Sequence, residues 1–253
     1  MRLEGKSAVV TGASGGIGRV ACRSFCEEGA AVLGVDVAVE EGTALEEELR
    51  ADGLDFEFRR CDVTSSAQVA AVARRAEERF GGLDVLVNSA GIILGKPLCD
   101  TTDEEWDRIL AVNLRGAFAT MRALAPLMRG RRASIVNVAS GLGLVGAPDM
   151  SAYCASKGGL VLLSKAAALE LGPGIRVNAL CPGVIDTDMP RRLAAGLPAE
   201  AGDALLRDFE ASHVAGRLGT PEEVVAFVVF LASDDASFVT GAAIPVDSGV
   251  TAQ

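Results

Sequence analysis

The chain has little that would take it to a membrane or a nucleic acid. Its 253 residues contain no run of about 18 apolar residues, the length that a membrane-spanning helix needs. The formal net charge of −10 disfavours a nucleic-acid or anionic-membrane partner. The N-terminal stretch MRLEGKSAVVTG carries charges and runs straight into an apolar strand pattern, unlike a secretory signal. We therefore expect a cytoplasmic protein that binds neither nucleic acid nor membrane.

Metal-binding patterns are missing as well. The six cysteines are scattered, none forms a CxxC pair, and the chain has a single histidine, His213. A structural zinc site needs about four such ligands in characteristic spacing. We predict no metal site and expect the cysteines to be free, small, mostly buried side chains.

Aromatic residues make up only 4% of a chain that is 49% hydrophobic. Most of its short apolar runs are apolar throughout, which is typical of parallel strands covered on both faces. They alternate with helical patterns, which predicts an α/β fold: a single-domain doubly wound (Rossmann) parallel sheet of about seven strands with helices on both faces. The predicted strands are 7–11, 31–36, 56–61, 84–88, 134–140, 175–181 and 243–246, and the predicted helices 16–28, 40–51, 66–80, 103–128, 151–171 and 221–232.

No repeat or Pro/Ser-rich linker divides the chain, so we expect one domain over residues 1–253. Only the stretch at about 187–219 breaks the strand–helix rhythm. Long insertions at this end of an α/β sheet are commonly lids or binding loops. We interpret it as an irregular substrate lid and refer to residues 187–219 as the lid segment.

A glycine-rich turn, TGASGGIG at 11–18, joins the first predicted strand to the first helix. Glycines there let the backbone approach a pyrophosphate at the helix N-terminus. The spacing is GxxxGxG and not the GxGxxG of the usual dinucleotide-binding fingerprint, but its glycines allow the same close approach of the backbone to a pyrophosphate. Asp36 ends the second strand, where a carboxylate accepts hydrogen bonds from ribose hydroxyls and repels a 2′-phosphate. With Gly15 and Val37 beside it, no cation is evident, so we expect NAD.

The only tyrosine, Tyr153, lies one helical turn before Lys157, one of four lysines in a chain with twenty arginines. A free phenol, with a pKa of about 10, is a poor base at neutral pH. An ammonium at i+4, together with an oxidised nicotinamide, could lower that pKa. An isolated YxxxK is more often a surface pair. Here, however, Ser140 ends the fifth strand at the sheet edge where ligands bind, which favours an active site.

Several motifs together resemble the short, single-domain branch of the short-chain dehydrogenase/reductase family. They are TGASGGIG, CDV at 61–63, NSAG at 88–91, VNLRG at 112–116, Ser140, YCASK at 153–157 and PGVIDT at 182–187. The chain departs from the family pattern with NSAG for NNAG, Ala139 before Ser140 and VDSG at 246–249 for VDGG. None of these departures removes a reacting group.

The resemblance implies a catalytic set of Tyr153 as general acid/base, Lys157 on the nicotinamide ribose, Ser140 on the carbonyl oxygen and Asn113 on a relay water. It also implies Asp62 at the adenine, Asn88 and Ala90 along the groove and Thr187 at the carboxamide. The expected cofactor-binding residues are Gly12, Ser14, Gly15, Gly16, Ile17, Gly18, Asp36, Val37, Asp62, Val63, Asn88, Ala90, Gly91, Tyr153, Lys157, Pro182, Gly183, Val184, Ile185 and Thr187.

Three other functions compete with an NAD-dependent alcohol dehydrogenase. A hydrolase would need a GxSxG elbow and a histidine, but Ser140 lacks the first glycine and His213 lies in the lid segment. A non-catalytic dinucleotide sensor would have no need of Asn113, Ser140, Tyr153 and Lys157 together. An NADP-linked reductase similar to the 3-oxoacyl-carrier-protein reductases is the main alternative, which the charge of Asp36 disfavours.

Apolar residues in the lid segment and in the loops opposite it favour an apolar substrate. Such a substrate would be a secondary alcohol or ketone that is alicyclic, steroid-like or acyl. The same residues could instead merely pack the lid segment. Helices 103–128 and 151–171 are apolar on more than one face and need partners, and the family resemblance implies a homotetramer through them. The expected substrate-facing residues are Met189, Leu193, Leu197, Leu205, Leu206 and Phe209 of the lid segment, with Ile92, Leu94, Leu142, Leu144 and Val145 opposite.

Overall fold

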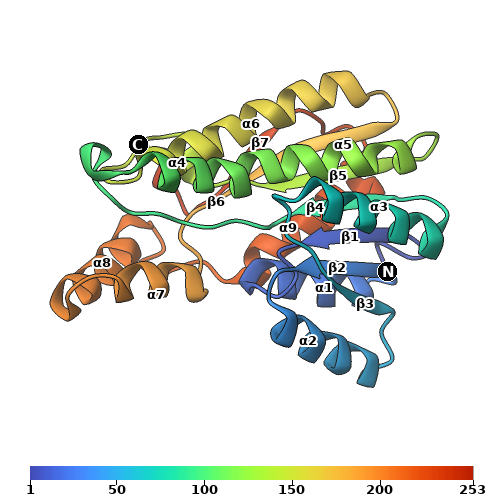
Figure 1. The fold of residues 1–253 in the computed structure, drawn as a ribbon, viewed down its shortest axis with the longest axis horizontal. Helices are drawn as coiled ribbons and strands as arrows, with labels where there is room; N and C mark the ends of the chain where they lie inside the picture. The colour runs from blue at the N-terminus through green and yellow to red at the C-terminus, as the bar shows by residue number, and fades with distance from the viewer. Residues whose placement is uncertain (253) are drawn as a thin grey trace.

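A computed structural model describes residues 1–252 and contains one parallel sheet in the order β3-β2-β1-β4-β5-β6-β7 (Figure 1). This order confirms the predicted doubly wound α/β fold. Because β1 pairs with both β2 and β4, the strand order reverses at that point. The strands are β1 (Ser7–Thr11), β2 (Ala31–Asp36), β3 (Phe56–Arg60), β4 (Val85–Asn88), β5 (Ala133–Val138), β6 (Ile175–Pro182) and β7 (Ala243–Val246).

Helices cover both faces of the sheet, and several begin at capping residues. Thr102 and Thr220 each form a capping box, and Ser65 caps a third helix through its hydroxyl. Among the residues described, no helix combines the length and apolar character that crossing a bilayer requires. The helices are α1 (Gly16–Glu27), α2 (Val39–Ala51), α3 (Ser66–Phe80), α4 (Asp103–Leu110), α5 (Ala117–Met128), α6 (Ser151–Leu171), α7 (Asp188–Ala195), α8 (Ala199–Ser212) and α9 (Pro221–Ala232).

Successive residues of each strand serve opposite cores. On β1, Ala8 and Val10 pack with residues of α1, α2 and α9, whereas Val9 packs with residues of α3 and α5. Side chains alternate across a strand, so a strand covered on both faces must be apolar at every position. This explains why the strands read as continuous apolar runs.

Two predicted elements differ from the structure. The expected single helix 103–128 is interrupted by a π-helical stretch, η2 (Ala111–Gly116), which contains Asn113. The lid segment is not irregular: it forms α7 and α8, which lie together at one end of the molecule, away from the helices that cover the sheet (Figure 1). Both helices have start signals, Asp188 in the first turn of α7 and Pro198 before α8. The alternation of strands and helices is therefore interrupted by two consecutive helices and not by irregular structure.

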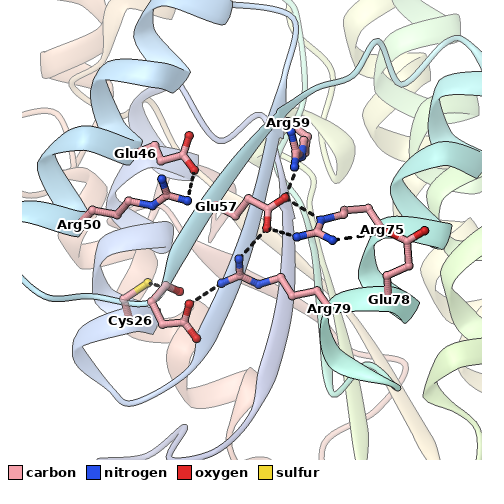
Figure 2. A network of polar contacts seen from close by, with 9 residues as sticks. Cys26, Glu46, Arg50, Glu57, Arg59, Arg75, Glu78 and Arg79 are labelled. Atoms are coloured by element: carbon pink, nitrogen blue, oxygen red, sulfur yellow. Dashed lines mark hydrogen bonds and ion pairs between the residues drawn. The ribbon is translucent and has the colours of Figure 1, made fainter.

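A buried carboxylate ties the edge strand β3 to helix α3. Glu57 is 4% exposed and accepts hydrogen bonds from Arg59 on β3 and from Arg75 and Arg79 on α3, at 2.6–2.8 Å (Figure 2). The hydrogen bonds from these guanidinium groups, that of Arg75 above all, lower the pKa of Glu57 from 4.5 to about 2. Burial acts in the opposite direction and is the weaker effect. One charge therefore organises three cations at the outer edge of the sheet.

We expect Glu57→Gln to lower the free energy of unfolding by about 2–3 kcal/mol at neutral pH, because three guanidinium groups lose their shared anion. The carboxyl pKa is depressed in the folded state, so its stabilisation is complete above about pH 4.5 and is lost as the pH falls toward 2. Urea titrations from pH 7 downward should therefore show the two proteins converging in acid. Glu78→Gln is the control, since this exposed carboxylate lies 3.5 Å from Arg75 and contributes little. Equal losses in both variants would contradict the assignment.

Candidate active site

The glycine turn between β1 and α1 is shaped by close backbone contacts. Gly12 has a φ of +69°, and a Cβ there would lie 2.7 Å from the Ala90 nitrogen. A Cβ on Gly18 would lie 2.0 Å from the Gly12 oxygen, and one on Gly16 would lie 2.3 Å from Cγ2 of Thr187. These glycines therefore let the segments after β1, β4 and β6 touch.

The N-terminus of α1 fits an anionic group. Helix α1 starts after Gly15 with no side-chain cap and no acidic residue in its first turn, so side chains do not neutralise its free N–H groups. A Cβ on Gly15 would have only the Gly12 oxygen nearby, at 3.6 Å, which leaves the outer side of the turn open. Ser14 and Ile17 flank this opening. The arrangement suits the pyrophosphate of a dinucleotide.

Asp36 lies at the carboxyl end of β2 and is bonded to the same turn. One carboxylate oxygen accepts the Ser14 N–H at 3.0 Å, and the other accepts those of Val37 at 2.6 Å and Ala38 at 3.1 Å. A carboxylate has about four acceptor positions, so room remains for a ribose hydroxyl. Asp36 thus also fixes the glycine turn to β2, a role the sequence did not reveal. Arg60 on β3 is its register partner.

Asp62 and Val63 follow β3 and form the far end of the predicted groove. One oxygen of Asp62 accepts the Thr64 hydroxyl at 2.7 Å and the Thr64 N–H at 2.9 Å, and these bonds hold the pKa of Asp62 below its usual value. The second oxygen has no hydrogen-bond donor among residues 1–252 and can accept one from a ligand. Val63 is buried, and its Cγ2 lies 2.7 Å from where a Cβ on Gly116 would be.

The side chain of Asn88 binds inside the fold. Its amide nitrogen donates to the Asn137 oxygen at 2.8 Å, and its oxygen accepts the Thr120 hydroxyl at 2.6 Å. Asn137 in turn donates to Ser164 at 2.8 Å, which links β4 and β5 to α5 and α6. Asn88 can therefore shape the groove by fixing the backbone that leads to Ala90, whose N–H donates to Thr11 at 3.2 Å.

Ser140, Tyr153 and Lys157 come together beyond β5. Tyr153 and Lys157 are 7% and 5% exposed, and the Lys157 Nζ lies 5.8 Å from the phenol ring centre. One Lys157 hydrogen donates to the Val138 carbonyl at 2.8 Å, which leaves two donors for other partners. Ser140 lies two residues after β5 and accepts the Leu142 N–H at 3.1 Å.

Burial dominates the electrostatics of this group. It raises the pKa of Tyr153 to about 12, while the Ser140 hydroxyl acts in the opposite direction on the same pKa. It also lowers the pKa of Lys157 to about 8. In the protein alone, therefore, the Lys157 ammonium does not lower the pKa of the Tyr153 hydroxyl toward 7, which the YxxxK spacing by itself would suggest. A further positive charge must lie beside the phenol for it to ionise readily.

Asn113 lies in the π-helical stretch and joins the loop after β4. Its oxygen accepts the Ile92 N–H at 2.8 Å, and its nitrogen donates to the Ile92 carbonyl at 2.9 Å and to Ser156 at 3.1 Å. A Cβ on Gly91 would lie 3.4 Å from the Asn113 oxygen and 3.5 Å from the Lys157 Nζ. The bare backbone of Gly91 therefore leaves space between the amide and the ammonium. π-Helical turns occur often at functional sites.

The segment after β6 closes the other side of the groove. Pro182 ends the strand, the Gly183 N–H donates to the Val246 carbonyl at 3.0 Å, and Asp186 and Gly219 pair through their backbones. The Ile185 N–H donates to no acceptor in residues 1–252, although Ile185 is only 7% exposed. This donor is therefore free to bond a ligand.

The lid segment presents apolar side chains inward. Every charged residue in it is exposed, and a Cβ on Gly95 would lie 2.9 Å from Cδ1 of Leu193, so α7 packs on the loop after β4. Leu197, Leu144 and Val145 are exposed, contrary to an inward placement. The remaining expected wall residues are half-buried: Met189, Leu193, Leu205, Leu206 and Phe209, with Ile92, Leu94 and Leu142 opposite.

Sequence reasoning gave no structural role to His213, which we placed at the surface or in the lid segment. The structure buries it, 4% exposed, against the segment after β6. Its Nε2 accepts the Val184 N–H at 3.1 Å. A lone histidine in the lid segment carries no signal of such a contact, because the partner is 29 residues away.

Comparison with known proteins agrees with this geometry. The family model described as enoyl-(acyl carrier protein) reductase matches residues 12–251. The chain is 44% identical over 248 residues to the cis-4-hydroxycyclohexanecarboxylate dehydrogenase of Sinomonas cyclohexanicum, covering 97% of this chain and 96% of the relative. It is 40% identical over 254 residues to the 3-oxoacyl-(acyl-carrier-protein) reductase FabG of Thermotoga maritima, covering 99% of each.

A solved structure, the ligand-free aldohexose dehydrogenase of Thermoplasma acidophilum, superposes with a TM-score of 0.89 at 34% identity. The superposition covers 99% of this chain and 96% of that one. The names of these three proteins cover an alicyclic hydroxy acid, an oxoacyl group on a carrier protein and a sugar, so likeness alone does not select a substrate. The chain belongs to the short-chain dehydrogenase/reductase family, whose members are oxidoreductases that bind a nicotinamide dinucleotide.

Proposed function

We propose that this protein is an NAD-dependent dehydrogenase that transfers a hydride between NAD(H) and an apolar secondary alcohol or ketone. The observation that supports it most directly is the buried pair of Tyr153 and Lys157 beside Ser140, at the carboxyl edge of the sheet. The uncapped start of α1 and the carboxylate of Asp36 lie at the same edge. One ligand could therefore span both places.

When bound, the dinucleotide supplies or accepts the hydride, and the residues of this chain handle the proton. Tyr153 would take the proton of the alcohol during oxidation and return it to the ketone oxygen during reduction. The Ser140 hydroxyl would orient that oxygen, and the two free donors of Lys157 would hold the ribose. The space at Gly91 would admit a water between Lys157 and Asn113, which could carry the proton to solvent.

Tyr153→Phe should abolish this chemistry and spare binding. Because the variant loses only the hydroxyl, we expect kcat to fall by about 10²–10⁴-fold, the range for loss of a general acid/base. The dissociation constant for NADH should change by less than about twofold, since the ring still fills its buried site. Turnover is read from the absorbance of the reduced nicotinamide, and binding from its fluorescence.

The control for that experiment is Cys154→Ala, which changes the next residue of α6 and leaves the hydroxyl in place. Wild-type turnover in the Phe variant would contradict the assignment of Tyr153. NADH binding without turnover of any alcohol or ketone by the unchanged protein would instead favour a non-catalytic dinucleotide sensor.

Asp36 supports NAD over NADP, because its carboxylate would repel a 2′-phosphate. The NADP-linked 3-oxoacyl-carrier-protein-type reductase remains the second candidate, since one relative at 40% identity has that name. The structure adds a feature in its favour: Arg60 on β3 is in register with Asp36 and exposed, so a cation lies near the position.

The two cofactors at equal concentration decide between these candidates. We expect kcat/KM to be at least about 100-fold higher with NAD than with NADP, the effect of an unneutralised like charge. Asp36→Asn should narrow that ratio at least about tenfold, because it removes the charge and keeps one oxygen for the Val37 and Ala38 N–H groups. Arg60→Ala is the control and should leave the ratio high. A wild-type preference for NADP would overturn the assignment.

An apolar substrate body fits the half-buried leucines of the lid segment and the exposed position of all its charges. Alicyclic alcohols, steroid-like alcohols and acyl chains share that character. A panel of secondary alcohols and ketones assayed with NAD(H) would rank these classes.

We also propose that the protein is a homotetramer. An open groove of about 640 Å³ runs between α4, η2, α5 and α6 and is lined largely by apolar side chains. Phe118 in this groove is 44% exposed, and Leu162 and Leu169 on α6 are 67% and 86% exposed. Exposed apolar surface on two neighbouring helices is typical of a subunit contact.

Light scattering at micromolar concentration should give the mass of a tetramer, and Phe118→Glu should give a smaller species. The variant replaces an exposed apolar ring with a carboxylate that must lose its water when subunits associate, even though Arg115 and Arg122 lie nearby. Circular dichroism and thermal unfolding of the variant check that each subunit remains folded. A monomeric unchanged protein would rule out the proposed assembly.

A further inference from the structure

His213 is a buried polar residue that the proposed chemistry does not use. It follows α8 and is the only histidine of the chain. Its Nε2 accepts the Val184 N–H at 3.1 Å, and its Nδ1 lies 2.7 Å from the Phe209 carbonyl and 3.3 Å from the Ser212 hydroxyl. Because Val184 must donate to Nε2, the ring carries its proton on Nδ1 and donates it to Phe209.

The imidazole leaves no room for a side chain on the neighbouring segment. A Cβ on Gly183 would lie 2.6 Å from Nε2 and 3.0 Å from the Cα of Asp247. Gly183 therefore lies directly between the imidazole and Asp247, so the ring packs tightly against the segment that follows β6. The lid segment is fixed at this end, because Val214 and Ala215 also donate to Ser248 through their N–H groups, both at 2.9 Å.

Two contacts together set the direction of the unpaired Ile185 N–H. Gly219 donates to the Val184 carbonyl at 3.0 Å, and that carbonyl belongs to the same peptide group as the Ile185 N–H. In a trans peptide the two point in opposite directions, so the Ile185 N–H faces away from Gly219. The preceding peptide, which carries the Val184 N–H, is held by His213. With both peptides fixed, the free donor is held in place for a ligand.

We propose that His213 is a positioning residue: by accepting the Val184 N–H while donating to Phe209, it couples the end of α8 to the segment that receives the nicotinamide. The inference rests on the proposed function, because it takes residues 182–187 as part of the dinucleotide site. His213 touches neither the reacting atoms nor the dinucleotide. It acts through Val184.

Two substitutions separate the two hydrogen bonds of the ring. His213→Gln places an amide oxygen where Nε2 lies and can still accept the Val184 N–H. His213→Asn is shorter and places its amide near Nδ1, so it can still donate to Phe209 but leaves Val184 without an acceptor. His213→Asn also lacks one methylene that His213→Gln keeps, so thermal unfolding of both variants separates lost packing from the lost hydrogen bond. Ser212→Ala is the control, since the Ser212 hydroxyl contacts Nδ1 and the Phe209 carbonyl but not Nε2 or Val184.

The measurements are NADH titration by fluorescence, steady-state kinetics and thermal unfolding on the full chain. We expect His213→Asn to raise the NADH dissociation constant and the KM for NAD by about tenfold, the effect of a buried donor left unpaired. At saturating NAD, kcat should stay within about twofold. His213→Gln should restore binding to within about threefold at a similar unfolding temperature. Ser212→Ala should bind as the unchanged protein does.

Equal NADH affinity in the Asn and Gln variants would overturn the inference and leave the proposed function intact. No NADH binding by the unchanged protein would instead remove the proposed function, and the inference with it. Should the Asn variant fail to fold, Gly183→Ala tests the same contact, because its Cβ displaces Nε2 while the histidine stays. Unaltered NADH affinity in that variant would likewise count against the positioning role.

Discussion

Backbone contact at the carboxyl edge of the sheet is the constraint on which the rest of the site depends. A side chain at Gly12 or Gly16 would push apart the segments that follow β1, β4 and β6, because its Cβ would lie within 2.7 Å of Ala90 or Thr187. With hydrogen as the side chain, the start of α1, the loop at Gly91 and the free N–H of Ile185 share one surface. The sheet places these segments as neighbours, and the glycines allow them to touch.

Burial determines the pKa values of the two titratable side chains on this surface, Tyr153 and Lys157. Removing Tyr153 and Lys157 from water favours the neutral form of each, so the pKa of the phenol rises and that of the ammonium falls. The protein alone is therefore poorly prepared to ionise the phenol. The same burial excludes the water that would screen a charge placed nearby, so a cationic partner beside Tyr153 would act strongly. The proton transfer proposed for Tyr153 would thereby depend on a ligand occupying the site.

The sequence predicted what depends on local spacing. Continuous apolar runs predicted the parallel strands, and the glycine turn and the YxxxK pair pointed to the carboxyl edge of the sheet, where the structure places both. It did not reveal features that depend on distant partners. The VNLRG motif includes Gly116, but the sequence does not indicate that Gly116 lies against Val63 beside the π-helical stretch. The hydrogen bond between Asn88 and Asn137 likewise joins residues 49 positions apart. The bond between Val184 and the buried His213 joins residues 29 positions apart. In each case the pattern gave the residue type and tertiary packing gave its role.

The lid segment combines fixed ends with an apolar inner face, and this bears on how a substrate is selected. Its first end is held by the pairing of Asp186 with Gly219, and its second by His213 on Val184 and by Ser248. Between these ends, α7 and α8 pack against each other. All of its charged side chains are exposed, whereas Met189, Leu193, Leu205, Leu206 and Phe209 are half-buried, and the proposal of an apolar substrate rests on this contrast. Relatives named for chemically different substrates are consistent with selection by such a segment, since the residues proposed to move the proton, Tyr153 and Lys157, lie outside it.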